Sequence, residues 1–280
     1  MEVLKTVKMY VGGAFIRSES GNTEAFIPKS TKEEYARVCV ATRKDFRNAV
    51  VAAKDGAKAW SKLTAYNRSQ IMYRMAEMAQ ARESELINLL LDTTDKSEDE
   101  IVAEVQEAID TFVYYAGWCD KYQQVMGSVN PVAAPYHNFT SPENMGVVVH
   151  IDSNQFNLAK LVDNICAILV GGNSVISLVS SECPAVVTNL GEIFETSDLP
   201  AGVVNLLSGS YQDLSEHIAT HMEVKGISFQ NEDEKTYFKI RSESVDNMKR
   251  IMGDKKEKRK SLDLALDFIE QKTVWHPIGF

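Results

Sequence analysis

Residues 145–179 have the sequence MGVVVHIDSNQFNLAKLVDNICAILVGGNSVISLV, and its alternating apolar segments set the fold class. The segment 146–151 is a short apolar, β-branched run, which is typical of a strand buried on both faces. Apolar residues recur at helical spacing over 158–169, and Gly171-Gly172-Asn173 ends that helix because glycine and asparagine tolerate a left-handed backbone. Residues 174–179 are the next predicted strand.

The alternation of strands and helices continues to residue 229. Pro184 opens the next predicted helix, where its missing N–H costs nothing, and residues 203–207 and 226–229 are the third and fourth strands. This order predicts right-handed crossovers and an α/β fold, a doubly wound, Rossmann-like parallel sheet with helices on both faces. Such sheets bind ligands beyond the carboxyl ends of their strands, so functional side chains are expected in the loops that follow these strands.

The composition points away from nucleic acid and membranes. With 30 basic and 39 acidic residues the net charge is −9, which disfavours binding to nucleic acid or anionic lipid. The sequence shows no signal-peptide pattern and no apolar run near the roughly 18 residues that a membrane span requires. The four cysteines have no close spacing, so we expect reduced thiols in the cytoplasm rather than a disulfide framework or a zinc site.

Capping boxes predict two helices in the part of the chain before residue 145. Thr42 with Asp45 opens the first helix, and Ser97 with Glu100 opens a long one that runs to Gly127. The other predicted elements are a hairpin around Gly12-Gly13, a strand over 35–41, a helix from Thr64, an extended hairpin over 131–144 that projects from the body, a helix from 231 to about 241, a helix over 262–269 and a strand over 272–275.

Four segments, in chain order, resemble the aldehyde dehydrogenase superfamily. They are the helix pair over 49–81 with Ala57-Lys58-Ala59-Trp60 and Asn67-Arg68, the helix with Tyr114-Tyr115-Ala116-Gly117-Trp118, the Gly171-Gly172-Asn173 helix end, and residues 198–205. The resemblance implies a Rossmann-like cofactor-type domain over 1–127 and 145–260, with N-terminal helices. It also implies a small β oligomerisation arm, made of a hairpin over 128–144 and a C-terminal strand within 261–280.

The resemblance also implies that the catalytic parts of the family are missing. The chain is similar to the cofactor half joined to the terminal strand, as in the non-catalytic second module of two-module aldehyde dehydrogenases. The acidic general base of the family falls at Asp254, and no cysteine follows it, so the thiol catalytic domain is expected to be absent. The asparagine that steadies the oxyanion falls at Gln155, whose amide lies one methylene further out. No catalytic residue and no metal ligand is assigned.

By the same resemblance, the NAD(P) crevice is degenerate. Its residues would be Ile151, Asp152, Ser153, Gln155, Leu178, Ser181, Gly209, Phe229 and Asn231. Leu178 and Ser181 stand where the family has a ribose-binding lysine and glutamate. The helix opening that binds pyrophosphate in the family reads Asn231-Glu232-Asp233-Glu234 here, and its acids would repel a phosphate. We therefore assign no cofactor outright and expect NAD(P) to bind weakly.

Three functions compete at this point. The first is a non-catalytic structural or assembly subunit, whose partner is a second copy or a complete aldehyde dehydrogenase. Its contacts would include Pro131, Tyr136, Phe139, Lys272, Val274 and Trp275. The second is an NAD(P)-dependent aldehyde oxidoreductase completed by a partner chain, and the third is a sensor of a nucleotide or other small molecule.

A few other residues could carry chemistry, and each has a plainer interpretation. Cys166 lies mid-helix among apolar residues and is expected to be core. His217 and His221 have the spacing of a helical metal pair, but no third ligand fits, so surface histidines are favoured. His150 and Asp152 are expected to form a hydrogen-bonded pair, and the charge run 255–260 a solvated linker.

Overall fold

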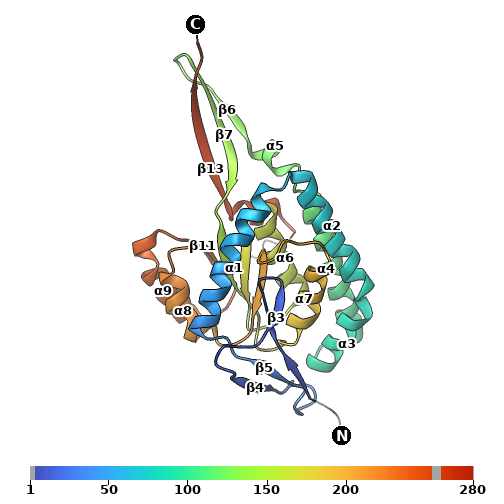
Figure 1. Cartoon of the computed structure of the whole chain (residues 1–280). Helices are drawn as coiled ribbons and strands as arrows, with labels where there is room; N and C mark the ends of the chain where they lie inside the picture. The colour runs from blue at the N-terminus through green and yellow to red at the C-terminus, as the bar shows by residue number, and fades with distance from the viewer. Residues whose placement is uncertain (1–3, 254–259, 280) are drawn as a thin grey trace.

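A seven-stranded sheet forms the centre of the computed structural model, which describes residues 4–253 and 260–279 (Figure 1). Its strand order is β12-β11-β8-β9-β10-β2-β3. The strands are β2 (Met9–Val11), β3 (Ala14–Ile16), β8 (Val147–Ile151), β9 (Ser174–Leu178), β10 (Val204–Leu207), β11 (Val224–Phe229) and β12 (Arg250–Gly253). The strands from β8 to β12 are parallel, and the antiparallel β2–β3 hairpin completes one edge. The predicted doubly wound α/β fold is therefore confirmed.

The chain order places a topological switch between β8 and β11. From β8 the chain passes through α6 (Leu158–Val170) to β9 and through α7 (Val186–Glu195) to β10. The next helix, α8 (Tyr211–Thr220), returns the chain to the other side of β8, and α9 (Glu234–Glu243) and η1 (Val245–Asn247) lead on to β12. The chain therefore leaves β8 and β11 in opposite directions, and the loops after these strands meet at the switch point, where a ligand crevice is expected.

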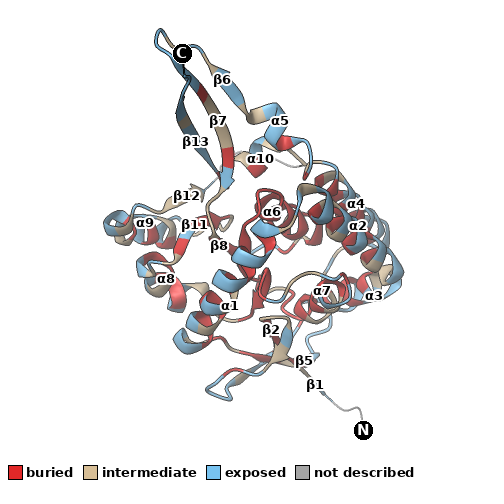
Figure 2. Ribbon diagram, turned by 45° about the horizontal axis from the view of Figure 1, so that its top comes forward, coloured by how far each residue is buried: buried red, intermediate tan, exposed pale blue. Residues whose placement is uncertain are grey.

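Helices cover both faces of this sheet (Figure 2). On one face α6 and α7 pack on the strands, with α2 (Ala65–Ala81), α3 (Glu83–Thr93) and α4 (Glu98–Ala116) outside them. On the other face α1 (Arg43–Lys62) packs with α8 and α9. Because α6 lies between the sheet and α4, nearly all of its residues are buried. Within the described ranges, no helix has enough apolar length to cross a membrane.

Both predicted capping boxes are present. The Thr42 hydroxyl accepts the Asp45 N–H at the start of α1, and the Ser97 hydroxyl accepts the Glu100 N–H at the start of α4. Burial alone would raise the pKa of Asp45, but hydrogen bonds from the Glu19 and Thr42 N–H groups and from two hydroxyls outweigh it. The pKa of Asp45 therefore lies below its usual value.

The prediction of one long helix from Ser97 to Gly127 is wrong. The helix α4 ends at Ala116, a turn follows, and a separate short helix α5 (Tyr122–Met126) ends at Gly127. Gly117 is the C-cap of α4, and its N–H bonds the Val113 carbonyl. Pro184 likewise lies in the turn before α7 rather than at its first residue.

A second, small sheet was not predicted. Its order is β1-β5-β4, and its strands are β1 (Lys5–Val7), β4 (Thr23–Phe26) and β5 (Ala36–Cys39). The strand predicted over 35–41 is β5, but it belongs to this sheet and not to the central one. The sequence signals also missed α3 and β12.

A third sheet projects from the body, and we call it the arm (Figures 1 and 2). It has the order β13-β7-β6 and consists of β6 (Ser128–Asn130), β7 (Tyr136–Asn144) and β13 (Ile269–Pro277). The predicted hairpin over 131–144 supplies β7, but its first strand lies earlier, at β6. The predicted strand 272–275 is the middle of β13, which follows α10 (Leu262–Leu266) and pairs with all of β7.

One prediction falls largely on residues that the structure does not describe. These residues include Asp254 and most of the charge run 255–260. At the end of that run, the backbone N–H of Lys260 bonds the Asp163 carboxylate at 3.2 Å.

Candidate ligand crevice

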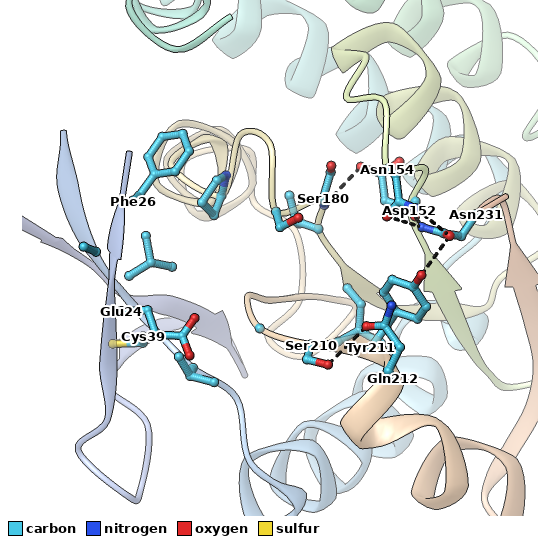
Figure 3. A pocket seen from close by; sticks show the side chains of 18 residues that line it. Glu24, Phe26, Cys39, Asp152, Asn154, Ser180, Ser210, Tyr211, Gln212 and Asn231 are labelled. Atoms are coloured by element: carbon cyan, nitrogen blue, oxygen red, sulfur yellow. Dashed lines mark hydrogen bonds between the residues drawn. The ribbon is translucent and has the colours of Figure 1, made fainter. Parts of the chain in front are cut away.

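The crevice at the switch point contains a cleft of about 280 Å³. Figure 3 shows its two sides. The loops after β8, β9, β10 and β11 supply Asp152, Asn154, Ser180, Tyr211 and Asn231, and β4 and β5 supply Glu24, Phe26 and Cys39 on the opposite wall. The small sheet therefore closes a cleft that the central sheet opens, which the sequence analysis did not foresee.

The residues named from the sequence fall in three groups. Asp152, Leu178, Ser181, Gly209 and Asn231 line this cleft, and Gln155 and Ser181 line a neighbouring cleft of about 670 Å³. Ile151 and Phe229 are buried at the ends of their strands. Ser153 lies in the loop after β8, where its side chain bonds Glu232. The structure thus gathers most of the named residues around the switch point.

Glu232 occupies hydrogen-bond donors of the loop between β8 and α6. One carboxylate oxygen accepts the Ser153 hydroxyl at 2.7 Å, and the other accepts the Asn154 N–H at 3.3 Å. A ligand phosphate at this position would compete with a carboxylate that the chain itself supplies. The contact also brings the loops after β8 and β11 together across the switch point.

Two more carboxylates take the N–H groups that follow in the same loop. Glu182 accepts the Phe156 N–H at 3.0 Å, and Glu104 accepts the Leu158 N–H at 2.6 Å. Burial raises the pKa of Glu182, but hydrogen bonds from Lys29 and from Phe156 outweigh it, so the pKa is low and the group is ionised at neutral pH. The Phe156 and Leu158 N–H groups are therefore already bonded to anions of the chain, and the Lys160 N–H bonds the Asn157 side-chain oxygen.

At the start of α9, a carboxylate of the chain also occupies a backbone N–H group. The Asp233 carboxylate accepts the Thr236 N–H at 3.0 Å and the Thr236 hydroxyl at 2.6 Å. These hydrogen bonds hold the pKa of Asp233 below its usual value. Asn231 connects the loop after β11 to the loop after β8 and to α8. Its side-chain nitrogen donates to the Asp152 carbonyl at 3.0 Å, and its side-chain oxygen accepts the Tyr211 hydroxyl at 2.9 Å.

The floor of the cleft is apolar at the end of β9. Leu178 is 3% exposed, and Val179 and Pro184 line the cleft beside it. A leucine offers no hydrogen bond to the hydroxyl groups of a ligand. This part of the cleft can therefore pack against a ring, but its side chains cannot hold a ribose by hydrogen bonds.

Comparison with known proteins identifies the family. The family model described as "Aldehyde dehydrogenase family" matches residues 15–254. This chain belongs to the aldehyde dehydrogenase family. It is 30% identical over 258 residues to cytosolic 10-formyltetrahydrofolate dehydrogenase of Homo sapiens, which covers 88% of this chain and 28% of that protein. It is also 30% identical over 249 residues to the putative aldehyde dehydrogenase DhaS of Bacillus subtilis, which covers 88% of this chain and 50% of that protein.

The fold of this aldehyde dehydrogenase family member matches solved structures of the family. A point mutant of betaine aldehyde dehydrogenase from Staphylococcus aureus, in complex with NAD+, matches with a TM-score of 0.82 and 25% identity. The match covers 89% of this chain and 50% of that one. The chain therefore spans half or less of the length of the relatives named here.

Burial limits the reactivity of the thiols in this family member, although Cys39 also lines the cleft. All four cysteines, Cys39, Cys119, Cys166 and Cys183, are free and buried, and Cys166 is a core residue as predicted. Burial raises the pKa of Cys119 to about 12 and that of Cys183 to about 11. Since the thiolate is the nucleophilic form, the Cys119 and Cys183 thiols are inert at neutral pH. Within residues 4–253 and 260–279, no cluster of three or more metal-ligating side chains is present.

His150 and Asp152 do not form the expected hydrogen-bonded pair. The His150 Nε2 lies 3.7 Å from the Asp152 carboxylate, which is too long for a hydrogen bond. The other ring nitrogen lies 3.4 Å from the Ser228 hydroxyl on β11. The Asp152 carboxylate instead accepts the backbone N–H groups of Ser153 and Ser180, and so fixes two loops of the crevice.

Proposed function

We propose that this family member is non-catalytic and acts in assembly, joining a second copy of itself or a complete aldehyde dehydrogenase through the arm. The observation that carries the proposal is the exposed outer edge of β13, the last strand in the sheet of the arm. A sheet edge of this kind accepts another strand, with backbone hydrogen bonds giving affinity and alternate side chains giving specificity. A two-fold dimer is the simplest form of such an assembly.

The register of β13 identifies the backbone groups on that edge. The Ile278 N–H donates to the Pro135 carbonyl at 2.9 Å, which extends the β13–β7 ladder by one pair. Because bonded and non-bonded pairs alternate in an antiparallel ladder, the N–H groups of residues 272, 274 and 276 face β7, and those of 271, 273 and 275 face away. Pro142 and Pro277 fit this alternation, since each lies in a pair where no N–H is needed between the strands.

Apolar side chains on the arm also favour a partner. Val129, Phe139 and Val274 stand side by side across the three strands, and Val129 is 70% exposed. Trp275 is 58% exposed and contacts Tyr136, with 5.9 Å between the ring centroids. A thin sheet with exposed apolar groups gains stability when another chain covers it.

We expect Thr273→Pro to disrupt assembly, while Thr273→Ala leaves it intact. Both variants lose the same side-chain contact to Thr140, but only proline removes the outward N–H of residue 273. Light scattering at high micromolar concentration should report more than one chain per particle for the wild type and Thr273→Ala, and a monomer for Thr273→Pro. Deletion from Gln271 onward should give monomer or aggregate.

A well-behaved wild-type monomer, unchanged by the proline, would refute the assembly role. The nucleotide sensor would then be the better proposal.

Two features support the non-catalytic part of the proposal. All four cysteines are buried, and burial raises the pKa of the Cys119 and Cys183 thiols, which disfavours the thiolate that a covalent intermediate requires. The donors of the crevice loops are bonded to Glu232, Glu182 and Glu104. Free, buried thiols also suit a reducing compartment, and on that ground we propose a cytoplasmic location.

We expect NAD and NADP to bind the wild type with a Kd of about 1 mM or weaker, because phosphates would meet carboxylates at both loops of the switch point. The triple variant Leu178→Lys, Glu232→Gly, Asp233→Ser should bind about tenfold or more tightly, since it removes two carboxylates and adds a cation. Titration calorimetry measures both affinities.

The charge-matched control is the pair Glu216→Gln and Asp246→Ser, compared with the double variant Glu232→Gly, Asp233→Ser. Both residues are exposed acids outside the clefts described above, so the pair removes two negative charges without touching the crevice. If both sets of substitutions strengthen NAD(P) binding equally, the effect is due to net charge. Micromolar binding by the wild type would contradict the proposal of a degenerate site.

A further inference from the structure

Two histidines far apart in the sequence meet on the arm. His137 on β7 and His276 on β13 are direct partners in the antiparallel register, and both are exposed. Directly opposite residues point to the same face of a sheet, with their Cβ atoms about 5 Å apart. Two imidazoles on such a base can place one nitrogen each about 2 Å from a shared ion.

The metal pair of His217 and His221, which the sequence analysis weighed and disfavoured, is not formed. His217 lies in α8, but the helix ends at Thr220, so His221 leaves the helical spiral that a metal pair four residues apart requires. The His221 ring packs against Phe46, with 6.1 Å between the centroids, and its Nδ1 accepts the Glu223 N–H at 3.3 Å. The sequence analysis favoured surface histidines over a metal pair in α8, whereas strand pairing on the arm juxtaposes two other histidines.

We propose that His137 and His276 form a binding site for a divalent transition-metal ion, with Zn²⁺ as its first candidate. Imidazole nitrogen is a preferred ligand of this class of ion, whereas magnesium and calcium prefer oxygen. Two side chains leave coordination positions for water or for the same pair on a second arm. The buried thiols cannot compete for the ion, and the next cross-strand pair on the same face of the sheet is Val274 with Phe139, which supplies no ligand.

The test is zinc titration of the full chain after treatment with a chelator, followed by calorimetry. We expect binding in the micromolar range, with one ion per chain or one per two chains. His137→Gln and His276→Gln should each weaken it about tenfold or more, because a single imidazole has no chelate partner. His217→Gln is the matched control and should leave the affinity unchanged.

A second measurement locates the ion without any substitution. Diethyl pyrocarbonate modifies accessible histidines, and peptide mass analysis reports which of them react. Zinc should protect His137 and His276 and leave His217 reactive. Absence of zinc binding, or binding that survives His137→Gln together with His276→Gln, would overturn the proposal.

Discussion

Asn173→Leu is expected to lower the free energy of unfolding by about 4 kcal/mol or more. The Asn173 side chain is fully buried and makes four hydrogen bonds. Its oxygen accepts the N–H groups of Met145 and Gly146, and its nitrogen donates to the carbonyls of Ile168 and Phe268. Leucine has a similar volume and no polar atom, so each of these buried or part-buried backbone groups would lose its side-chain partner, at about 1 kcal/mol or more apiece.

The loss should be measured by denaturant unfolding followed by circular dichroism. Asn164→Leu is the control, since this asparagine is also buried but bonds a carbonyl of its own helix and the Ser228 hydroxyl. Its expected cost is about 2 kcal/mol. A loss of stability below about 1 kcal/mol for Asn173→Leu, or one no larger than that of the control, would show that the four hydrogen bonds of Asn173 contribute little to the stability of the fold.

Gly56→Ala is expected to destabilise the protein by about 2 kcal/mol or more, although alanine is the better helix former. In an ordinary helix this substitution gains about 1 kcal/mol. Here a Cβ on Gly56 would lie 2.3 Å from the Gly202 carbonyl carbon and 2.5 Å from the Val203 nitrogen. Both are backbone atoms, so α1 would have to move away from the turn before β10.

Lys58→Ala is the control for this prediction, because Lys58 is exposed on the same helix and its loss should change stability by no more than about 0.5 kcal/mol. Thermal unfolding of the two variants and the wild type compares them directly. A higher melting temperature for Gly56→Ala would mean that the helix and the turn can separate freely, which would contradict the expected result.

The central sheet could be predicted because each element carries its own signal. All five residues of β8 are buried, as its mostly apolar sequence indicates, and Thr42 and Ser97 begin helices by contacts within four residues. Only one strand of the small sheet, β5, was predicted, and the sheet itself was not. Its strands have only three or four residues, too few to show a period, and they are paired by contacts distant in the sequence.

The candidate site shows the same division. The loops after β8 and β11 could be named, because strand order places them at the switch point. Glu24 and Cys39 could not, because they reach the cleft from the small sheet. The roles of Glu104 and Glu182 were also hidden, since a carboxylate far along the chain gives no local sign that it will bond the Leu158 or Phe156 N–H.

The pairing of β7 with β13 means that the arm can form only after the C-terminal part of the chain has been synthesised. Thr140 and Thr273 lie 133 residues apart in the sequence, yet they face each other across the arm. During synthesis the chain emerges from its N-terminal end, so β7 leaves the ribosome long before its partner strand exists. Contacts at such separation also form slowly, because a long loop must close first. Until β13 arrives, one edge of β7 is open to neighbouring nascent chains, and chaperone demand should be highest in that interval.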